Sequence, residues 1–197
     1  ASGMSFASGL RSILRQDPDV ILVGEMRDAE TARIGVQAAL TGHLVLSSVH
    51  ATDAVSTVWR FLDMGIERFA LASSLLSVIG QRLVRRVCEY CQAPYTPTID
   101  ELAFFSAAGG DPLTDFVHGT GCNYCAKTGY RGRIGVYELV QIDERIRVAL
   151  IDESTSSDEI LALAKKSGMV TLKEQGVRLV QDQQTTVSEI IRSIYTI

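Results

Sequence analysis

Four cysteines in two Cys-x-x-Cys pairs carry the most specific chemistry in the sequence. Cys88 and Cys91 form one pair, Cys122 and Cys125 form the other, and the chain has no further cysteine. The short spacing lets both sulfurs of a pair point to one centre, so two pairs can complete a tetrahedral site, for which Zn²⁺ is the natural occupant. Because four thiolates leave no open coordination position, we expect the metal to stabilise structure rather than to catalyse.

Two disulfides or a redox-active dithiol are the alternatives for these cysteines. The segment between the pairs, residues 92–121, exceeds the usual zinc-ribbon separation of roughly 15 to 20 residues. Closing a longer loop costs only slowly more entropy, however. The N-terminal residues do not show the basic-then-apolar pattern of a signal peptide, so we expect a reducing interior, where disulfides are disfavoured. Structural zinc is therefore the prediction.

A second group of chemically capable side chains follows two apolar runs. The run at residues 20–23 leads into Glu25, and the run at residues 43–49 leads into His50. An apolar strand that ends in an acidic residue has the form of a Walker B element, whose carboxylate orients Mg²⁺ or the attacking water beside bound phosphates. Alone this pattern is weak, because any strand that ends in a charged loop matches it. The polar residues after the two runs are Glu25, Arg27, Asp28, Ser47, Ser48, His50, Thr52 and Asp53.

The elements that must position these side chains follow a strand, helix, strand pattern. Apolar spacing predicts a helix before the Asp17-Pro18 pair and another over residues 29–40, with Gly42 placed as a C-cap. The two apolar runs are the strands. Such a βαβ unit belongs to a parallel sheet, in which the carboxyl ends of neighbouring strands share one edge. Glu25 and His50 are therefore expected at the same edge.

The rest of the chain divides into zones of different composition. We expect three domains: residues 1–87 as an α/β core whose part from Asp53 to Val87 is helical, residues 88–132 as a loop-rich zinc insert, and residues 133–197 as a strand with a small bundle of four helices.

Composition excludes several classes of function. With 197 residues, 46% of them hydrophobic and 21% charged, the chain is ordinary for a globular protein, and its apolar runs are too short to span a bilayer. A net charge of −4 gives no electrostatic case for nucleic acid, and the basic cluster at residues 82–86 is too short to change that. We expect an intracellular protein without a nucleic-acid partner.

A phosphate-binding loop, G-x-x-x-x-G-K-[ST], is absent from the sequence, since the small-residue stretch "ASGMSFASG" lacks its lysine. The residues thus provide the water-orienting half of a nucleotide hydrolase without the phosphate-holding half. We expect this chain to be inactive by itself.

Five ordered segments resemble the secretion ATPase superfamily, and more narrowly the assembly ATPases of type II secretion and type IV pili (the GspE/PilB family). They are "LRQDPDVILVGEMRDAETA", "TGHLVLSSVHATDA", "GQRLVRRVCEYC", "GCNYCAKTGYRGRIGVYEL" and the helical tail. The twin Cys-x-x-Cys insert separates this branch from the retraction ATPases of pilus systems and from many DNA-conjugation relatives. The resemblance implies a partial RecA-like parallel sheet core, carrying the Cys₄ zinc insert and the C-terminal helical bundle.

The resemblance also assigns roles to single residues near the first strand. It makes Glu25 the catalytic Walker B glutamate, with Arg27 and Asp28 completing that motif. His43 and His50 fall on the family's histidine box, in which a histidine senses the γ-phosphate, and His50 is the stronger candidate because it lies beyond the strand tip. One departure is "SSVHATDA" for the more usual "STLHTNDA", which puts Thr52 where asparagine is common.

One further nucleotide-binding residue is implied within the basic cluster. Arg82 lies in the family's "QRL" block and is expected to reach nucleotide in its own or a neighbouring subunit. Arg85 and Arg86, which follow it, are interpreted as solvated charges.

The resemblance implies that this chain is the C-terminal part of a longer ATPase whose phosphate-binding loop and N-terminal domain lie upstream. ATP and Mg²⁺ are then the ligands of the complete protein, which works as a hexameric ring in the cytoplasm beside the inner membrane. Its expected partners are an inner-membrane platform protein and cytoplasmic recruitment proteins. Two alternatives stay open: a non-catalytic zinc-stabilised adaptor, and a DNA-translocating relative.

Overall fold

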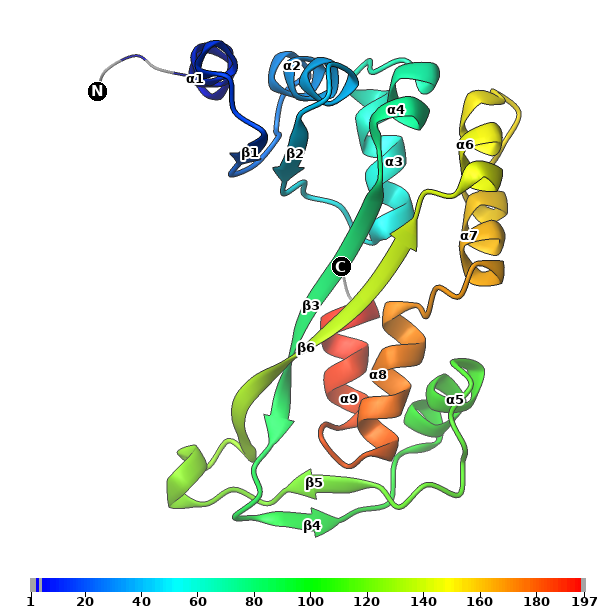
Figure 1. Cartoon of the computed structure of the whole chain (residues 1–197). Coiled ribbons are helices and arrows are strands. Elements are labelled where there is room, and N and C mark those ends of the chain that lie inside the picture. The colour runs from blue at the N-terminus through cyan, green and yellow to red at the C-terminus, as the bar shows by residue number, and fades with distance from the viewer. Residues whose placement is uncertain (1–2, 4, 196–197) are drawn as a thin grey trace. The chain divides into compact units, whose positions relative to one another are not determined.

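The computed structural model describes residue 3 and residues 5–195, and its helices and strands form a mixed α/β fold with small sheets (Figure 1). The chain makes two compact units, each built from two separate stretches of sequence. The first unit takes the described residues up to Val78 together with Val140–Met169. The second takes Ile79–Leu139 together with the described residues from Val170 onward.

The first unit contains the predicted βαβ motif. Strands β1 (Val20–Val23) and β2 (Leu44–Ser47) are parallel and in register from the Val20/Leu44 pair to the Val23/Ser47 pair. Helix α2 (Ala29–Leu40) connects them. It ends at Leu40, and Gly42 follows at the predicted glycine position with a φ of +102°, which favours glycine.

The remaining helices of this unit pack into one core. They are α1 (Phe6–Ile13), followed by a 3₁₀ turn (Leu14–Gln16), α3 (Ala54–Asp63), α4 (Arg68–Ser74), α6 (Glu144–Ile151) and α7 (Ser157–Lys166). The most deeply buried residues include Ala32, Val58, Leu71, Ile146 and Ile160. Helices α4 and α6 are also joined by the Arg147 Nη1 atom, which donates to the Ala72 carbonyl at 3.0 Å.

The second unit packs helices against a two-stranded ribbon. Most of strands β3 (Ser77–Val87) and β6 (Tyr130–Gln141), which pair with each other, lie in it. It also contains α5 (Ile99–Ala107), α8 (Leu172–Gln181), α9 (Val187–Ile190) with a π-helical turn after it (Ile191–Tyr195), and the antiparallel pair β4 (Gln92–Pro94) and β5 (Val117–Gly119). Its core includes Val84, Phe105, Val136, Val177 and Ile190.

The prediction that the chain is helical through Val87 is wrong for its last part. Helix α4 ends at Ser74, and residues 77–87 form β3. Val78, Val84 and Val87 are buried in β3, and the other residues of the strand are exposed or partly exposed, as in a half-buried strand. Glycine at position 80 leaves room for the Glu138 side chain of the paired strand β6, which a Cβ there would overlap.

The four predicted tail helices are present, but they do not form one bundle. Helices α6 and α7 belong to the first unit, and α8 and α9 belong to the second. The two units thus share the tail between them, and the predicted domain boundaries at residues 87/88 and 132/133 both fall inside the second unit. Among the described residues, no helix combines the length and apolar composition needed to cross a membrane.

Candidate functional site

The structure brings Glu25, Arg27 and His50 together at the carboxyl edge of the β1–β2 sheet. The Oε2 atom of Glu25 lies 2.7 Å from Arg27 Nε and 3.3 Å from His50 Nε2. The Glu25 side chain is 22% exposed, whereas those of Arg27 and His50 are 68% and 83% exposed. A mostly covered carboxylate thus lies beside two nitrogen groups that face solvent and could contact a phosphate.

The loop that carries Glu25 is anchored on both sides of that residue. The buried Met26 side chain packs on Gly35 of α2, where a Cβ would overlap the methionine Cε. Glycine at this position therefore allows α2 to lie close to the loop. The Met26 amide donates to the Ser48 carbonyl at 2.9 Å, which extends the pairing of the two chain segments past the strand ends.

Two aspartates near the site begin helices. Asp28 caps α2, where its Oδ1 accepts the Thr31 amide at 2.8 Å and its Oδ2 accepts the Thr31 hydroxyl at 2.9 Å. The Thr31 amide and then its hydroxyl lower the pKa of Asp28 from its ordinary value. Asp53 caps α3 in a capping box with Ser56. Asp28 is thus already engaged in local structure, next to the catalytic candidates.

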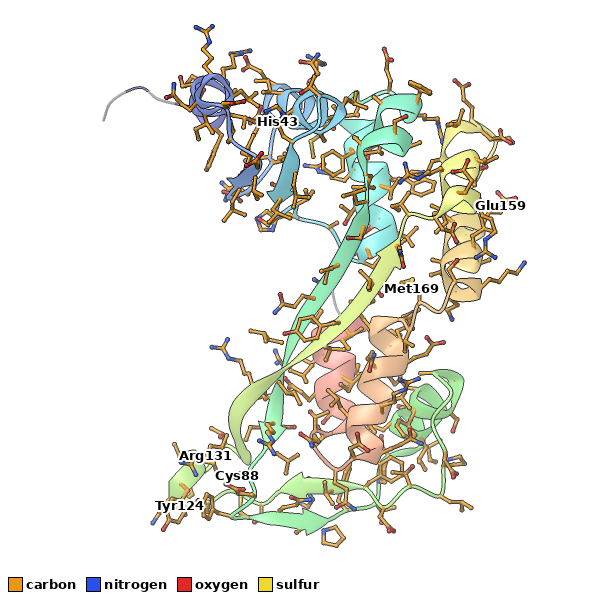
Figure 2. The ribbon with its side chains drawn as sticks, viewed as in Figure 1. His43, Cys88, Tyr124, Arg131, Glu159 and Met169 are labelled. Atoms are coloured by element: carbon orange, nitrogen blue, oxygen red, sulfur yellow. The ribbon has the colours of Figure 1, made fainter. Side chains whose placement is uncertain are left out.

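The structure does not bring His43 to this edge. His43 precedes β2, so it lies at the opposite end of that strand from His50, and the four residues of β2 between them span roughly 13 Å. Its Nδ1 lies 3.0 Å from the Ala38 carbonyl and 3.2 Å from the Thr41 hydroxyl, at the end of α2 (Figure 2). These contacts give His43 a place in the turn between α2 and β2.

The basic cluster lies on β3 in the second unit. Arg82 Nη1 donates to the Gln81 carbonyl at 3.0 Å. The interpretation of Arg85 as a solvated charge is wrong, because its guanidinium is bound to the fully buried carboxylate of Glu189, with an Nη2–Oε2 distance of 2.6 Å. Arg86 is exposed, as expected.

The four cysteines converge in the second unit. Their Sγ atoms all lie within 4.8 Å of one another. The Cys88–Cys122 sulfur distance is 3.9 Å, and the Cys91–Cys125 and Cys122–Cys125 distances are 3.8 Å. A tetrahedron of sulfurs at the usual Zn–S bond length has edges of about 3.8 Å. The donor set and its spacing therefore fit one metal ion, and the described cysteines are free thiols rather than disulfides.

Backbone amides point at the sulfurs. The amides of Cys122 and Gly129 donate to the Cys125 sulfur at 3.2 and 3.3 Å, and the Gly121 amide donates to the Cys91 sulfur at 3.3 Å. The Cys122 amide is the main reason that the pKa of Cys125 falls to about 6, whereas burial raises the pKa of Cys88 to about 11. Amide donors of this kind favour thiolates, the form that binds metal.

Two tyrosines that the sequence motifs did not indicate lie beside the cysteines. Tyr90 and Tyr124 precede the second cysteine of each pair, and their rings stack with centroids 4.4 Å apart. The Arg131 guanidinium lies 5.2 Å from the Tyr90 ring centroid (Figure 2). The repeated Cys-x-Tyr-Cys pattern was the signal that could have found this pair.

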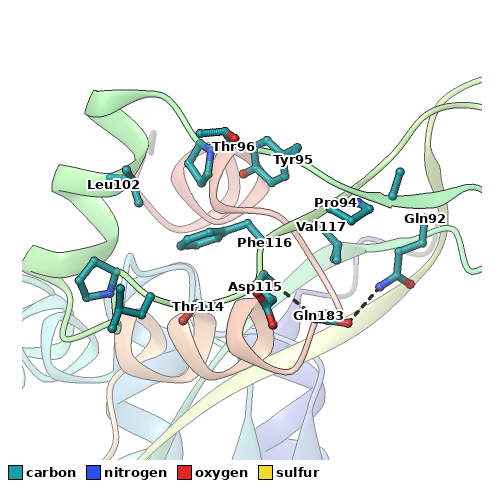
Figure 3. Close-up of a pocket in the computed structure, with 14 residues that line it drawn as sticks. Gln92, Pro94, Tyr95, Thr96, Leu102, Thr114, Asp115, Phe116, Val117 and Gln183 are labelled. Atoms are coloured by element: carbon teal, nitrogen blue, oxygen red, sulfur yellow. Dashed lines mark hydrogen bonds between the residues drawn. The ribbon is translucent and has the colours of Figure 1, made fainter.

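A separate hollow in the second unit contains none of the predicted site residues. It has a volume of about 610 Å³ and lies among β4, β5 and the segment around α5 (Figure 3). Pro94, Leu102, Phe116 and Val117 contribute apolar walls, and Gln183 donates to the Asp115 carbonyl at 3.3 Å. It adds no nucleophile, metal ligand or charged pair to the candidate chemistry.

Comparison with known proteins decides the family. A sequence profile described as Type II/IV secretion system protein matches residues 1–192. The chain belongs to this family. The resemblance found in the five sequence segments is thereby confirmed.

Curated members of the family match nearly the whole chain. Type II secretion system protein E of Pseudomonas aeruginosa is 48% identical over 189 residues, which are 96% of this chain and 37% of that protein. The type IV pilus assembly ATPase PilB of Thermus thermophilus is 41% identical over 191 residues, which are 96% of this chain and 21% of that protein. The chain thus spans well under half the length of these relatives.

Two solved structures of other proteins share the fold. The pilus retraction motor PilT with bound ADP superposes with a TM-score of 0.66 at 26% identity, covering 95% of this chain and 43% of that one. The Legionella pneumophila ATPase DotB superposes with a TM-score of 0.63 at 20% identity, covering 94% and 41%. The mixed α/β fold seen here is that of secretion ATPases.

Proposed function

We propose that this chain is the C-terminal part of a hexameric ATPase that hydrolyses ATP to power assembly of pilin or pseudopilin fibres, in type II secretion or type IV pili. The observation that carries the proposal is the meeting of Glu25 and His50 at one edge of a parallel sheet. Ligands of α/β proteins bind at that edge. The ATPases among the relatives support the reaction class.

In this proposal, the residues at the edge divide the work of hydrolysis. Glu25 accepts a hydrogen bond from the attacking water and orients it towards the γ-phosphate. His50 and Arg27, both exposed beside it, contact phosphate oxygens, and their release from Glu25 frees the carboxylate for water. Asp28 holds the start of α2. Mg²⁺, when bound with ATP, would neutralise part of the phosphate charge.

The proposed metal of the second unit is Zn²⁺. Cys88, Cys91, Cys122 and Cys125 hold it, and its role is structural, because the four sulfurs complete its coordination. The segment from β4 to β5 lies between the two cysteine pairs in sequence, so the ion ties down both ends of that segment.

The proposal for the complete protein includes a partial RecA-like core here and the rest of that core upstream. The protein works as a ring at the cytoplasmic face of the inner membrane, and Arg82 reaches nucleotide in its own or a neighbouring subunit. An inner-membrane platform protein and cytoplasmic recruitment proteins are the expected partners. Because the net charge is −4, we expect no nucleic-acid partner.

The test is ATP turnover by the longest chain that the gene encodes, with Glu25→Gln. Loss of the carboxylate should lower kcat about a hundredfold while ATP binding persists, since a general base contributes on the order of 10²–10⁴ in rate. The matched control is Glu30→Gln, because Glu30 is also an acidic residue of this region but pairs with Arg11 on α1.

Unchanged turnover in Glu25→Gln would overturn the proposal and favour a zinc-stabilised adaptor. Stimulation of turnover by DNA would instead favour a DNA-translocating member of the superfamily. Both measurements use phosphate release with saturating Mg²⁺ATP.

A further inference from the structure

Ser48 contacts the chain on both sides of Glu25. Its hydroxyl donates to the Gly24 carbonyl at 2.6 Å. Its carbonyl accepts the Met26 amide at 2.9 Å. The residues before and after Glu25 are therefore both hydrogen-bonded to one residue of the neighbouring chain segment.

Ser48 is also close in sequence to His50, the residue that contacts Glu25. Ser48 follows β2 directly and stands two residues before His50, whose ring contacts the Glu25 carboxylate. The two hydrogen bonds of Ser48 therefore tie the Glu25 loop to the segment that leads into His50. Neither Glu25 nor His50 lies within a regular strand, so the strand ladder alone does not set their separation.

We infer that Ser48 is a positioning residue for ATP hydrolysis, because its hydroxyl holds the Glu25 loop at the spacing from His50 that the reaction requires. The inference rests on the proposed function of the Glu25 site. Ser48 acts through Glu25, so its hydroxyl is not expected to touch the nucleotide. The Ser48 side chain makes the bond to Gly24, and the Ser48 main chain makes the bond to Met26. Replacing the side chain therefore removes the first bond and leaves the second.

A hydroxyl that only stabilises the fold would behave differently from one that positions Glu25. Loss of a purely structural bond lowers thermal stability and the amount of active protein together. Loss of a positioning bond lowers kcat and leaves KM for ATP nearly unchanged, because small displacements of a catalytic group are costly in rate but not in substrate binding.

The experiment measures phosphate release and thermal unfolding for the longest natural chain with Ser48→Ala, Ser48→Thr and Ser12→Ala. Ser12 is the matched control, since its exposed hydroxyl also donates to a backbone carbonyl, that of Ser8, but within helix α1. We expect Ser48→Ala to lower kcat about tenfold with KM within about twofold. Ser48→Thr keeps the hydroxyl and should restore kcat, and Ser12→Ala should match the wild type.

A double variant separates this inference from the proposed function. If Ser48 acts through Glu25, Ser48→Ala should change the residual turnover of Glu25→Gln by less than about twofold. Wild-type kcat in Ser48→Ala, or a loss that follows thermal stability and is not restored by threonine, would overturn the role of Ser48 while Glu25→Gln still lowers kcat about a hundredfold. Full turnover in Glu25→Gln would overturn the proposed function itself, and the positioning role with it.

Discussion

The Glu189 carboxylate binds both the backbone amide and the guanidinium of Arg85. The Oε1 atom accepts the Arg85 amide at 2.8 Å, and the Oε2 atom accepts the Arg85 Nε at 2.9 Å and Nη2 at 2.6 Å. Arg192 donates to the same carboxylate. A fully buried carboxylate thereby joins α9 to β3 within the second unit, across 104 positions of sequence.

Replacing Glu189 with glutamine should destabilise the second unit. The amide of glutamine can keep one acceptor for the Arg85 backbone but cannot pair with two guanidinium groups, so we expect a loss of about 2 kcal/mol in the free energy of unfolding. Urea unfolding followed by circular dichroism measures it. Glu153→Gln, at an exposed glutamate, is the control and should leave the unfolding midpoint unchanged.

The pH dependence identifies the carboxylate as the cause. Burial would raise the pKa of Glu189, but hydrogen bonds from Arg192 and Arg85 outweigh it and lower the pKa from 4.5 to about 2. The stabilisation is therefore complete above the unfolded-state value and is lost as pH falls from about 4.5 to about 2. The stability difference between wild type and Glu189→Gln should shrink over that range. A difference that is constant with pH would contradict this account.

Local sequence patterns predicted β1, α2 and β2 because each is set by nearby residues. The apolar run, the Asp28 cap and Gly42 all act within a few positions. The strand at residues 77–87 depends instead on partners far away in sequence. Gly80 accommodates Glu138, and Arg85 pairs with Glu189, so neither feature was visible to a local reading.

The candidate sites also differ in whether nearby residues or residues far away in sequence determine them. The cysteine spacing was sufficient to predict a cluster, because two short pairs constrain their own geometry. For the histidines, the resemblance placed both rings on the histidine box, and the position of His50 beyond the strand tip made it the stronger candidate. The structure agrees with that order, because the His50 ring lies beside Glu25 and His43 lies at the other end of β2.

Metal removal should expose all the thiols of the chain at once. The four cysteines are the only ones present and all lie in the cluster, so we expect one zinc per chain and almost no reaction with Ellman's reagent before chelation. Chelation under mild denaturation should release the zinc and four reactive thiols together. Cys125→Ser should lose the metal. Thiols that react fully in the untreated protein, with no zinc by elemental analysis, would contradict the site.

Gly129 should be essential for the cluster, whereas Gly109 should not. Both have positive φ, +77° and +88°. A Cβ at Gly129 would collide with the backbone of Gly119, and its amide and carbonyl bind the Cys125 sulfur and the Cys88 amide. A Cβ at Gly109 meets nothing within 4 Å. Both alanine variants carry the strain of positive φ, about 1 kcal/mol. Only Gly129→Ala should also lower zinc content, and equal zinc in the two variants would show that the backbone contact is unimportant.

The two histidines around β2 should differ in their effect on catalysis. His50 Nε2 lies 3.3 Å from Glu25, so under the proposed function His50→Ala removes a phosphate-contacting group and should lower kcat on the order of tenfold to a hundredfold. His43→Ala removes contacts at the α2–β2 turn and should mainly lower thermal stability, by a few degrees. Turnover and unfolding temperature, measured for both variants of the longest natural chain, give two independent readouts. If His43→Ala reduced kcat as much as His50→Ala without a loss of stability, the histidine-box role would belong to both rings, and the separation along β2 would not determine which one contacts phosphate.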